Sequence, residues 1–223
     1  MLKQVLDLYE LLDRADVDGH SVTSLLKSRG AQSVDLVELT GSTGKTDFIR
    51  IIIDGSDGRR RGGLAPTIGI TGRLGGLGAR PNLTGFVSDG DGALAALAVA
   101  LKLCDMEAGG DRLAGDVVVT THISPDAPTV PHEPVPMMSS HVAVDTINKL
   151  EVEHKVDAVL SVDTTKGNRI VNHRGFAISC TVKQGYILRV SDDLLDIMMR
   201  VTGRLPVVFA LSQQDVTPYG NDI

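Results

Sequence analysis

The first fifty residues switch from helical to strand-like spacing of apolar positions. Leucine and valine recur every three or four residues from Leu2 to Leu12, which predicts an amphipathic helix ending near Asp13. A second helix is predicted over 21–29, with Gly30 as its C-terminal stop. Residues 34–39 and 48–53 have the composition of strands, and the turn residues between them predict a hairpin.

The rest of the chain alternates short apolar runs with helical patterns. It predicts strands over 67–71, 116–120, 158–162 and 205–211, helices over 93–106, 142–150 and 192–202, and a hairpin-like stretch over 175–190. Strands that alternate with helices are typical of α/β folds. We therefore predict an α/β three-layer sandwich with a mostly parallel central sheet. No linker or repeat interrupts the pattern, so residues 1–223 are expected to form one domain.

Composition narrows the possible partners and the compartment. The net charge is −6 and aromatic residues make up 3% of the chain, which argues against nucleic acid. No apolar run is long enough to span a membrane, and the N-terminus lacks the pattern of a signal peptide. The two cysteines, Cys104 and Cys180, form no disulfide framework. We therefore expect a cytoplasmic protein.

Two segments resemble phosphate- or cation-binding loops without matching them. The run from Gly41 to Thr46 ends like a P-loop, but Leu39 stands where the first glycine is required, and the run joins two predicted strands. The segment from Asp89 to Gly92 begins like a calcium loop but lacks its later glycine and glutamate. Neither pattern supports a nucleotide or calcium site.

Polar residues gather directly after the predicted strands, where α/β sheets place their sites. They are Asp89, Asp91, His122, Asp126, His132, Glu133, Asp163, Thr164, Lys166, His173 and Arg174. Aspartate and histidine are ligands of zinc and of manganese. Each residue also has an ordinary explanation: Asp89 could cap a helix, His122 could be a partnered histidine at a strand end, and Asp163 could form a turn.

The order of these elements resembles the co-catalytic zinc exopeptidases, a superfamily that includes aminopeptidases and carboxypeptidases. The segment 68–75 is similar to the strand that ends in a metal-binding motif, and 87–97 is similar to the helix that begins with a bridging aspartate. The segment 116–122 stands where a strand precedes a Glu-Glu pair, and 157–165 is similar to the strand that delivers a further ligand. The chain resembles still more closely a bacterial and archaeal family of unknown function.

Because these groups follow successive strands in an order similar to that of the superfamily, one hypothesis is a single divalent metal, zinc or another, bound by Asp89, His122 and Asp163, with His173 or Asp126 as the fourth ligand. However, Arg73 and Gly75 stand where the superfamily has a histidine and an aspartate. The Glu-Glu pair and the final histidine also lack counterparts, so a C-terminal segment of the superfamily is expected to be missing.

Three functions follow from these matches and departures. The first is a divergent metal-dependent hydrolase of amide bonds in small peptide or amino-acid derivatives, with His122, Asp126 and Arg73 as catalytic candidates. The second is a metal-free protein that binds a small carboxylate or peptide, with Arg73 as a clamp for a carboxylate. The third is a structural subunit. The candidate ligand-binding residues are Arg73, Thr164, Lys166, His173 and Arg174. A homo-oligomer is also expected.

Overall fold

The computed structural model describes residues 1–73, 75–78, 84–131, 137–151, 155–164 and 172–209. The chain divides into two compact units, Met1–Thr164 and Thr165–Ile223. The expectation of one domain over 1–223 stays a prediction.

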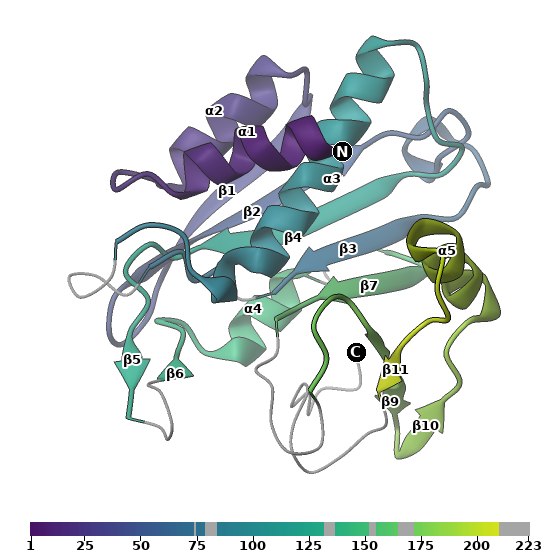
Figure 1. Ribbon diagram of the computed structural model, residues 1–223. Helices are drawn as coiled ribbons and strands as arrows, with labels where there is room; N and C mark the ends of the chain where they lie inside the picture. Colours follow the sequence, from purple (N-terminus) through teal and green to yellow (C-terminus); the bar gives the residue numbers. More distant parts are fainter. Residues whose placement is uncertain (74, 79–83, 132–136, 152–154, 165–171, 210–223) are drawn as a thin grey trace. The chain divides into compact units, whose positions relative to one another are not determined.

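A five-stranded mixed sheet is the centre of the first unit (Figure 1). Its strands lie in the order β1, β2, β4, β3, β7. The elements of this unit are α1 (Leu2–Leu12), α2 (Gly19–Ser28), β1 (Ser33–Thr40), β2 (Lys45–Ile53), the 3-10 turn η1 (Arg59–Arg61), β3 (Ile68–Gly72), the 3-10 turn η2 (Ser88–Gly90), α3 (Asp91–Ala108), β4 (Val117–Ile123), β5 (Thr129–Val130), β6 (Met137–Met138), α4 (Val144–Glu151) and β7 (Ala158–Val162).

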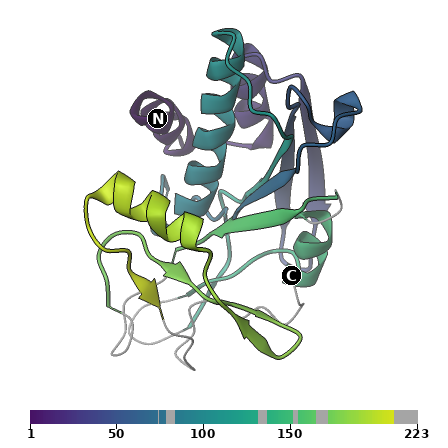
Figure 2. The ribbon, with the colours of Figure 1, turned by 90° about the vertical axis from the view of Figure 1, so that its right-hand side faces the viewer.

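The two faces of the sheet bury different kinds of side chain. Ile49, Ile51 and Ile53 of β2 point to one face, where they pack in the apolar core with residues of α1, α2 and α3. Because side chains alternate along a strand, Arg50 points to the other face. There its Nη2 donates to the carbonyl of Leu150 in α4 at 2.8 Å. Helices therefore cover both faces, as Figure 2 shows for α3 and α4.

The sheet is not the mostly parallel one that the sequence predicts. β3 runs parallel to both β4 and β7, but β2 is antiparallel to β4 and to β1. The predicted hairpin is therefore confirmed, and it joins the sheet through β2. The period of apolar residues identifies a strand but does not show whether the adjacent strand runs parallel or antiparallel to it. The antiparallel pairing of β2 with β1 and β4 could therefore not be predicted in this way.

Close packing against His141 explains the glycines of the hairpin turn. A Cβ atom on Gly44 would lie 2.6 Å from the His141 ring, and one on Gly41 would lie 1.7 Å from the His141 carbonyl oxygen. Thr43 Oγ1 hydrogen-bonds His141 Nδ1 at 3.0 Å. The glycines of the P-loop-like run therefore leave room for His141.

The second unit contains a short hairpin, a parallel strand pair and one described helix. Its elements are β8 (Ile178–Ser179), β9 (Thr181–Lys183), β10 (Tyr186–Leu188), α5 (Asp192–Thr202) and β11 (Val208–Phe209). β9 pairs with β10, and β8 pairs with β11. The predicted hairpin and the helix over 192–202 are confirmed. Within the described parts of the chain, no helix has the length and apolar character that a membrane span requires.

Candidate functional site

A small pocket with several polar residues in its lining lies at the carboxyl end of β4 in the first unit. Its lining comes from several segments that are distant in sequence: Gly76, Asp89, His122, Ser124, Ala127, Met138, Ser139 and Ser140. Two residues predicted from strand ends and helix starts, Asp89 and His122, therefore share one pocket. The carboxyl ends of β3, β4 and β7 point the same way, which is the usual location of sites in such sheets.

Backbone pairing beyond β3 and β4 builds one wall of this pocket. The backbone N–H of Ser124 donates to the carbonyl of Gly75 at 2.8 Å, and the N–H of Leu77 donates to the carbonyl of Ser124 at 3.0 Å. A Cβ on Gly75 would lie 1.5 Å from the carbonyl oxygen of His122. Position 75 therefore requires glycine in this backbone, and it has no room for an aspartate.

A backbone contact fixes the protonation of His122. The N–H of Gly75 donates to Nε2 of His122 at 3.2 Å, so Nε2 is the acceptor. In a neutral imidazole the other nitrogen then carries the proton. Burial, and next the charge of Arg73, lower the pKa of His122 to about 4, which keeps the ring neutral at physiological pH.

Two polar atoms of the pocket residues lack a partner. Nδ1 of His122 and Oγ of Ser124 are buried and have no hydrogen-bond partner among the described residues. The two residues are 4% and 3% exposed. A buried polar group that stays unpaired costs about 1–3 kcal/mol, so such groups usually meet a ligand or an ordered water. These two atoms therefore make His122 and Ser124 the candidate contacts for a ligand or an ordered water.

Next to the pocket, Arg73 forms a buried ion pair with Glu151 of α4. Arg73 Nη2 lies 2.7 Å from Glu151 Oε2, and the two side chains are 9% and 1% exposed. The N–H of Arg73 also donates to the carbonyl of Val162 at 2.7 Å, which ties the end of β3 to β7. The arginine at the position where the sequence resemblance predicts a metal-binding histidine thus has an internal partner.

Burial dominates the electrostatics of Glu151. Desolvation raises its pKa to about 7, while Arg73 acts in the opposite direction and Asp163 adds to the rise. The charge of Asp163, a predicted metal ligand, thus acts on the carboxyl of Glu151. The cluster of Arg73, Glu151 and Asp163 therefore contains one guanidinium and two carboxyl groups.

The described residues do not fit the dimetal centre that the sequence resemblance implies. No group of three histidine, cysteine, aspartate or glutamate side chains among them is arranged to hold a metal ion. Gly75 cannot supply a ligand, Arg73 is cationic, and Nε2 of His122 already accepts a hydrogen bond. A zinc ligand needs a ring nitrogen with a free lone pair, but in this tautomer Nδ1 carries the proton and the lone pair of Nε2 accepts from the N–H of Gly75. The metal ligation by Asp89, His122 and Asp163 stays a prediction.

The other predicted site residues lie in several places. Asp126 is exposed and lies beside His141, whose Nε2 is 3.0 Å from the Asp126 carbonyl oxygen and 3.4 Å from its Oδ1. The N–H of Thr164 donates to Oδ1 of Asp163 at 2.7 Å, a local contact directly after β7.

Three predicted ligand-binding residues cannot be assigned to this pocket. His173 and Arg174 belong to the second unit, where the His173 ring meets Phe209 edge-on at 6.2 Å. Lys166 lies outside the described residues, as do His132 and Glu133.

Asp89, His122 and Ser124 share the pocket, which raises the possibility of a serine nucleophile. A serine is activated when a neighbouring histidine offers a free lone pair to the hydroxyl proton. Here the lone pair of His122 is at Nε2, where it accepts from Gly75, and Nδ1 carries a proton. The three residues therefore suit ligand binding better than nucleophilic catalysis.

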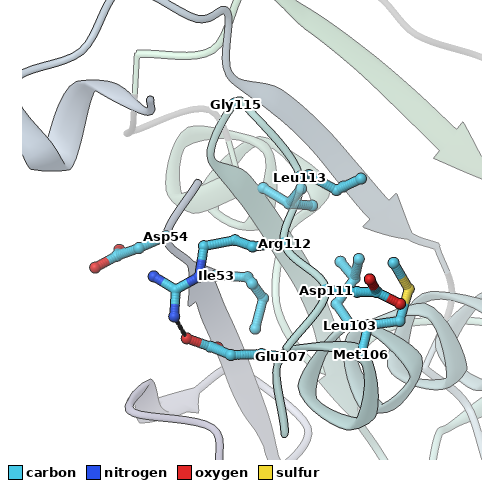
Figure 3. Close-up of a pocket in the computed structure, with 10 residues that line it drawn as sticks. Ile53, Asp54, Leu103, Met106, Glu107, Asp111, Arg112, Leu113 and Gly115 are labelled. Carbon is cyan, nitrogen blue, oxygen red and sulfur yellow. Dashed lines mark hydrogen bonds and ion pairs between the residues drawn. The ribbon is translucent and has the colours of Figure 1, made fainter. Parts of the chain in front are cut away.

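A second pocket lies at the opposite end of β4, beyond the C-terminal part of α3 (Figure 3). Its floor is apolar, with Leu103 and Val117 among the lining residues. Its arginine, Arg112, is paired with Glu107. The one cation among its described lining residues is therefore already paired, so this pocket is the weaker candidate for an anionic ligand.

The sequence profile of the family described as "Protein of unknown function (DUF1177)" matches residues 37–223. The chain belongs to this family. Membership of a family of unknown function is thereby confirmed. No curated protein matches the chain. Among solved structures, a mutant of tomato leucine aminopeptidase is similar over 63% of this chain and 28% of its own, with 12% identity and a TM-score of 0.40. The matched region thus spans 28% of that protein, and the link to zinc exopeptidases stays a prediction.

Three residues of this DUF1177 member were missed by the sequence reasoning. Glu151 is the last residue of α4, where an acidic side chain resembles any solvent-exposed one. Ser124 and His141 occur in loops without a recognisable motif. A usable signal for Ser124 was its spacing of two from His122, because residues two apart on an extended chain face the same side.

Proposed function

We propose that the chain is a metal-independent binding protein for a small polar ligand, held in the pocket around His122 and Ser124. The observation that carries this proposal is the hydrogen bond from the N–H of Gly75 to Nε2 of His122. It uses the lone pair that a metal or a transferred proton would need, and it leaves Nδ1–H as a buried donor for a ligand.

The ion pair of Arg73 supports the metal-independent form of this proposal. A permanent guanidinium beside Glu151 offsets the negative charge that metal-binding carboxylates would bring to this place. The role of Arg73 as a clamp for a ligand carboxylate has less support, because its side chain is 9% exposed and is paired internally. We therefore assign ligand contact to the pocket lining, with Arg73 as a structural cation.

Amide NMR of the whole protein tests the proposal. A library of small polar compounds, added in the presence of EDTA, is expected to shift the amide signals of Gly75, Gly76 and Ser124. The amide of Ser28 in α2 is an internal control, since its side chain is exposed and bonded only to its own helix. Shifts that require added zinc, or stoichiometric zinc in protein purified without chelators, would contradict metal independence and favour the hydrolase.

A further inference from the structure

The chemistry of the pocket lining restricts what it can bind. His122 Nδ1–H is a donor, and Ser124 Oγ can donate or accept. Asp89 lines the same pocket, and a carboxylate has about four acceptor sites, so it can accept from a ligand in addition to its existing contacts. The pocket thus offers donors and acceptors side by side in a small space.

Ligand groups of a single polarity suit this lining poorly. A carboxylate has acceptors only, and it would meet the charge of Asp89 without any lysine or arginine among the described lining residues. An ammonium group has donors only, so it would leave the buried Nδ1–H of His122 without an acceptor. Either ligand would add an unpaired or repelled group to the pocket.

An uncharged group with a carbonyl oxygen next to an N–H₂ matches both requirements. Its oxygen can accept from Nδ1–H of His122 and from the Ser124 hydroxyl, while its amino hydrogens can donate to Asp89. The apolar part of the lining, Ala127 and Met138, suits the carbon substituent of such a group. The carbonyl oxygen and the amino nitrogen of such a group lie about 2 Å apart in one plane. This compact arrangement suits the small size of the pocket.

Building on the proposed binding function, we infer that the ligand carries a primary carboxamide or urea-type group, and that the pocket of Asp89, His122 and Ser124 recognises it. The His122 donor selects the carbonyl and the Asp89 carboxylate selects the N–H₂. Ser124 contributes the second contact to the carbonyl oxygen.

Ligand-observed NMR with three isosteric probes tests the inference on the whole protein in EDTA. Acetamide is expected to receive saturation from the protein, whereas acetate and methylammonium are not. Ser124→Ala is expected to weaken acetamide binding about tenfold, because one hydrogen bond is lost. Ser28→Ala makes the same chemical change at an exposed helix position and is expected to leave binding unchanged. Amide spectra of both variants verify the fold.

The possible results separate the two proposals. Acetate or methylammonium binding that depends on Ser124, without acetamide binding, would overturn the carboxamide assignment and keep the binding function. Acetamide binding that needs added zinc would keep the ligand class and overturn metal independence. Binding that Ser124→Ala leaves unchanged would overturn the assigned pocket, and binding of none of the probes would overturn both proposals.

Discussion

Arg73 and Glu151 form an ion pair whose two side chains are buried. Each charge is stabilised by the other. Removal of one partner of a buried pair leaves a charge without compensation, which costs about 3–5 kcal/mol. We expect Arg73→Met to lower the free energy of unfolding by up to that amount, and by less as the pH falls through about 7, where the Glu151 carboxyl takes up a proton in the fold. The double change Arg73→Met and Glu151→Met is expected to restore most of it, because apolar side chains of similar size replace the pair. Denaturant unfolding measures both.

Arg60 provides the matched control for Arg73. It pairs with Asp54 at 2.7 Å, but the side chains are 46% and 31% exposed. Exposed pairs contribute about 0–1 kcal/mol, so Arg60→Met is expected to cost little. If Arg73→Met costs no more than Arg60→Met, the ion pair does not stabilise the site.

His122 and Glu151 are expected to give opposing pH dependences of stability. Burial raises the pKa of Glu151 from 4.5 to about 7, so the folded protein binds this proton more tightly and Glu151 lowers stability as pH rises through that window. Burial lowers the pKa of His122 from 6.5 to about 4, so the unfolded chain binds that proton more tightly and stability falls as pH drops from 6.5 to 4.

In Glu151→Gln the contribution of Glu151 no longer opposes that of His122. We expect the free energy of unfolding of this variant to fall by up to about 3 kcal/mol between pH 6.5 and pH 4. The unpaired Arg73 adds an offset that does not change over this range. Denaturant unfolding at several pH values measures the slope, with Glu151→Gln plus His122→Asn as the control. Equal slopes in the two variants would show that His122 does not remain neutral in the fold.

Sequence reasoning could find some residues of this site and not others. Asp89 and His122 stand out because they follow apolar runs, and ends of neighbouring strands meet in space. Glu151 has no such signal, since only the packing of α4 on the polar face of the sheet distinguishes it from a surface acid. The tautomer of His122 depends on a backbone N–H contact, which no sequence pattern records.

At the scale of elements, the glycine-rich segment joins β3 to the start of α3. A Cβ on Gly92 would lie 2.3 Å from the carbonyl oxygen of Arg73 and 2.5 Å from that of Val162. Both obstacles are backbone, so Gly92→Ala is expected to push α3 away from the strand ends and to cost about 1–3 kcal/mol. Thermal unfolding measures the loss.

Gly109, at the other end of α3, is the matched control for Gly92. The nearest atom to a Cβ there is 3.4 Å away, which is ordinary contact, so Gly109→Ala is expected to be nearly neutral. A neutral Gly92→Ala would show that α3 does not pack against the strand ends this closely. The sequence predicts α3 itself from its apolar period, but this contact arises from tertiary packing between distant segments.

For the whole molecule, the buried apolar residues are divided unequally between the two units. The apolar core cluster consists of residues between Leu8 and Cys104 together with residues of β4, all in the first unit. In the described part of the second unit, Met198 is the one buried apolar side chain, while Tyr186, Ile187 and Val201 are exposed. The homo-oligomer and the cytoplasmic location stay predictions. Light scattering of the full-length protein measures the oligomeric state.

This division of the core predicts how fragments behave and tests the single domain over 1–223. A fragment of residues 1–164 keeps the apolar cluster and the pocket, so it is expected to unfold cooperatively on heating. A fragment of residues 165–223 is small and has few buried apolar side chains among its described residues. A chain of this size needs a well-packed core to fold alone, so no cooperative transition is expected. Circular dichroism melts of both fragments and of the full chain measure this. A sharp transition of 165–223 alone would mean that the second unit is a domain of its own.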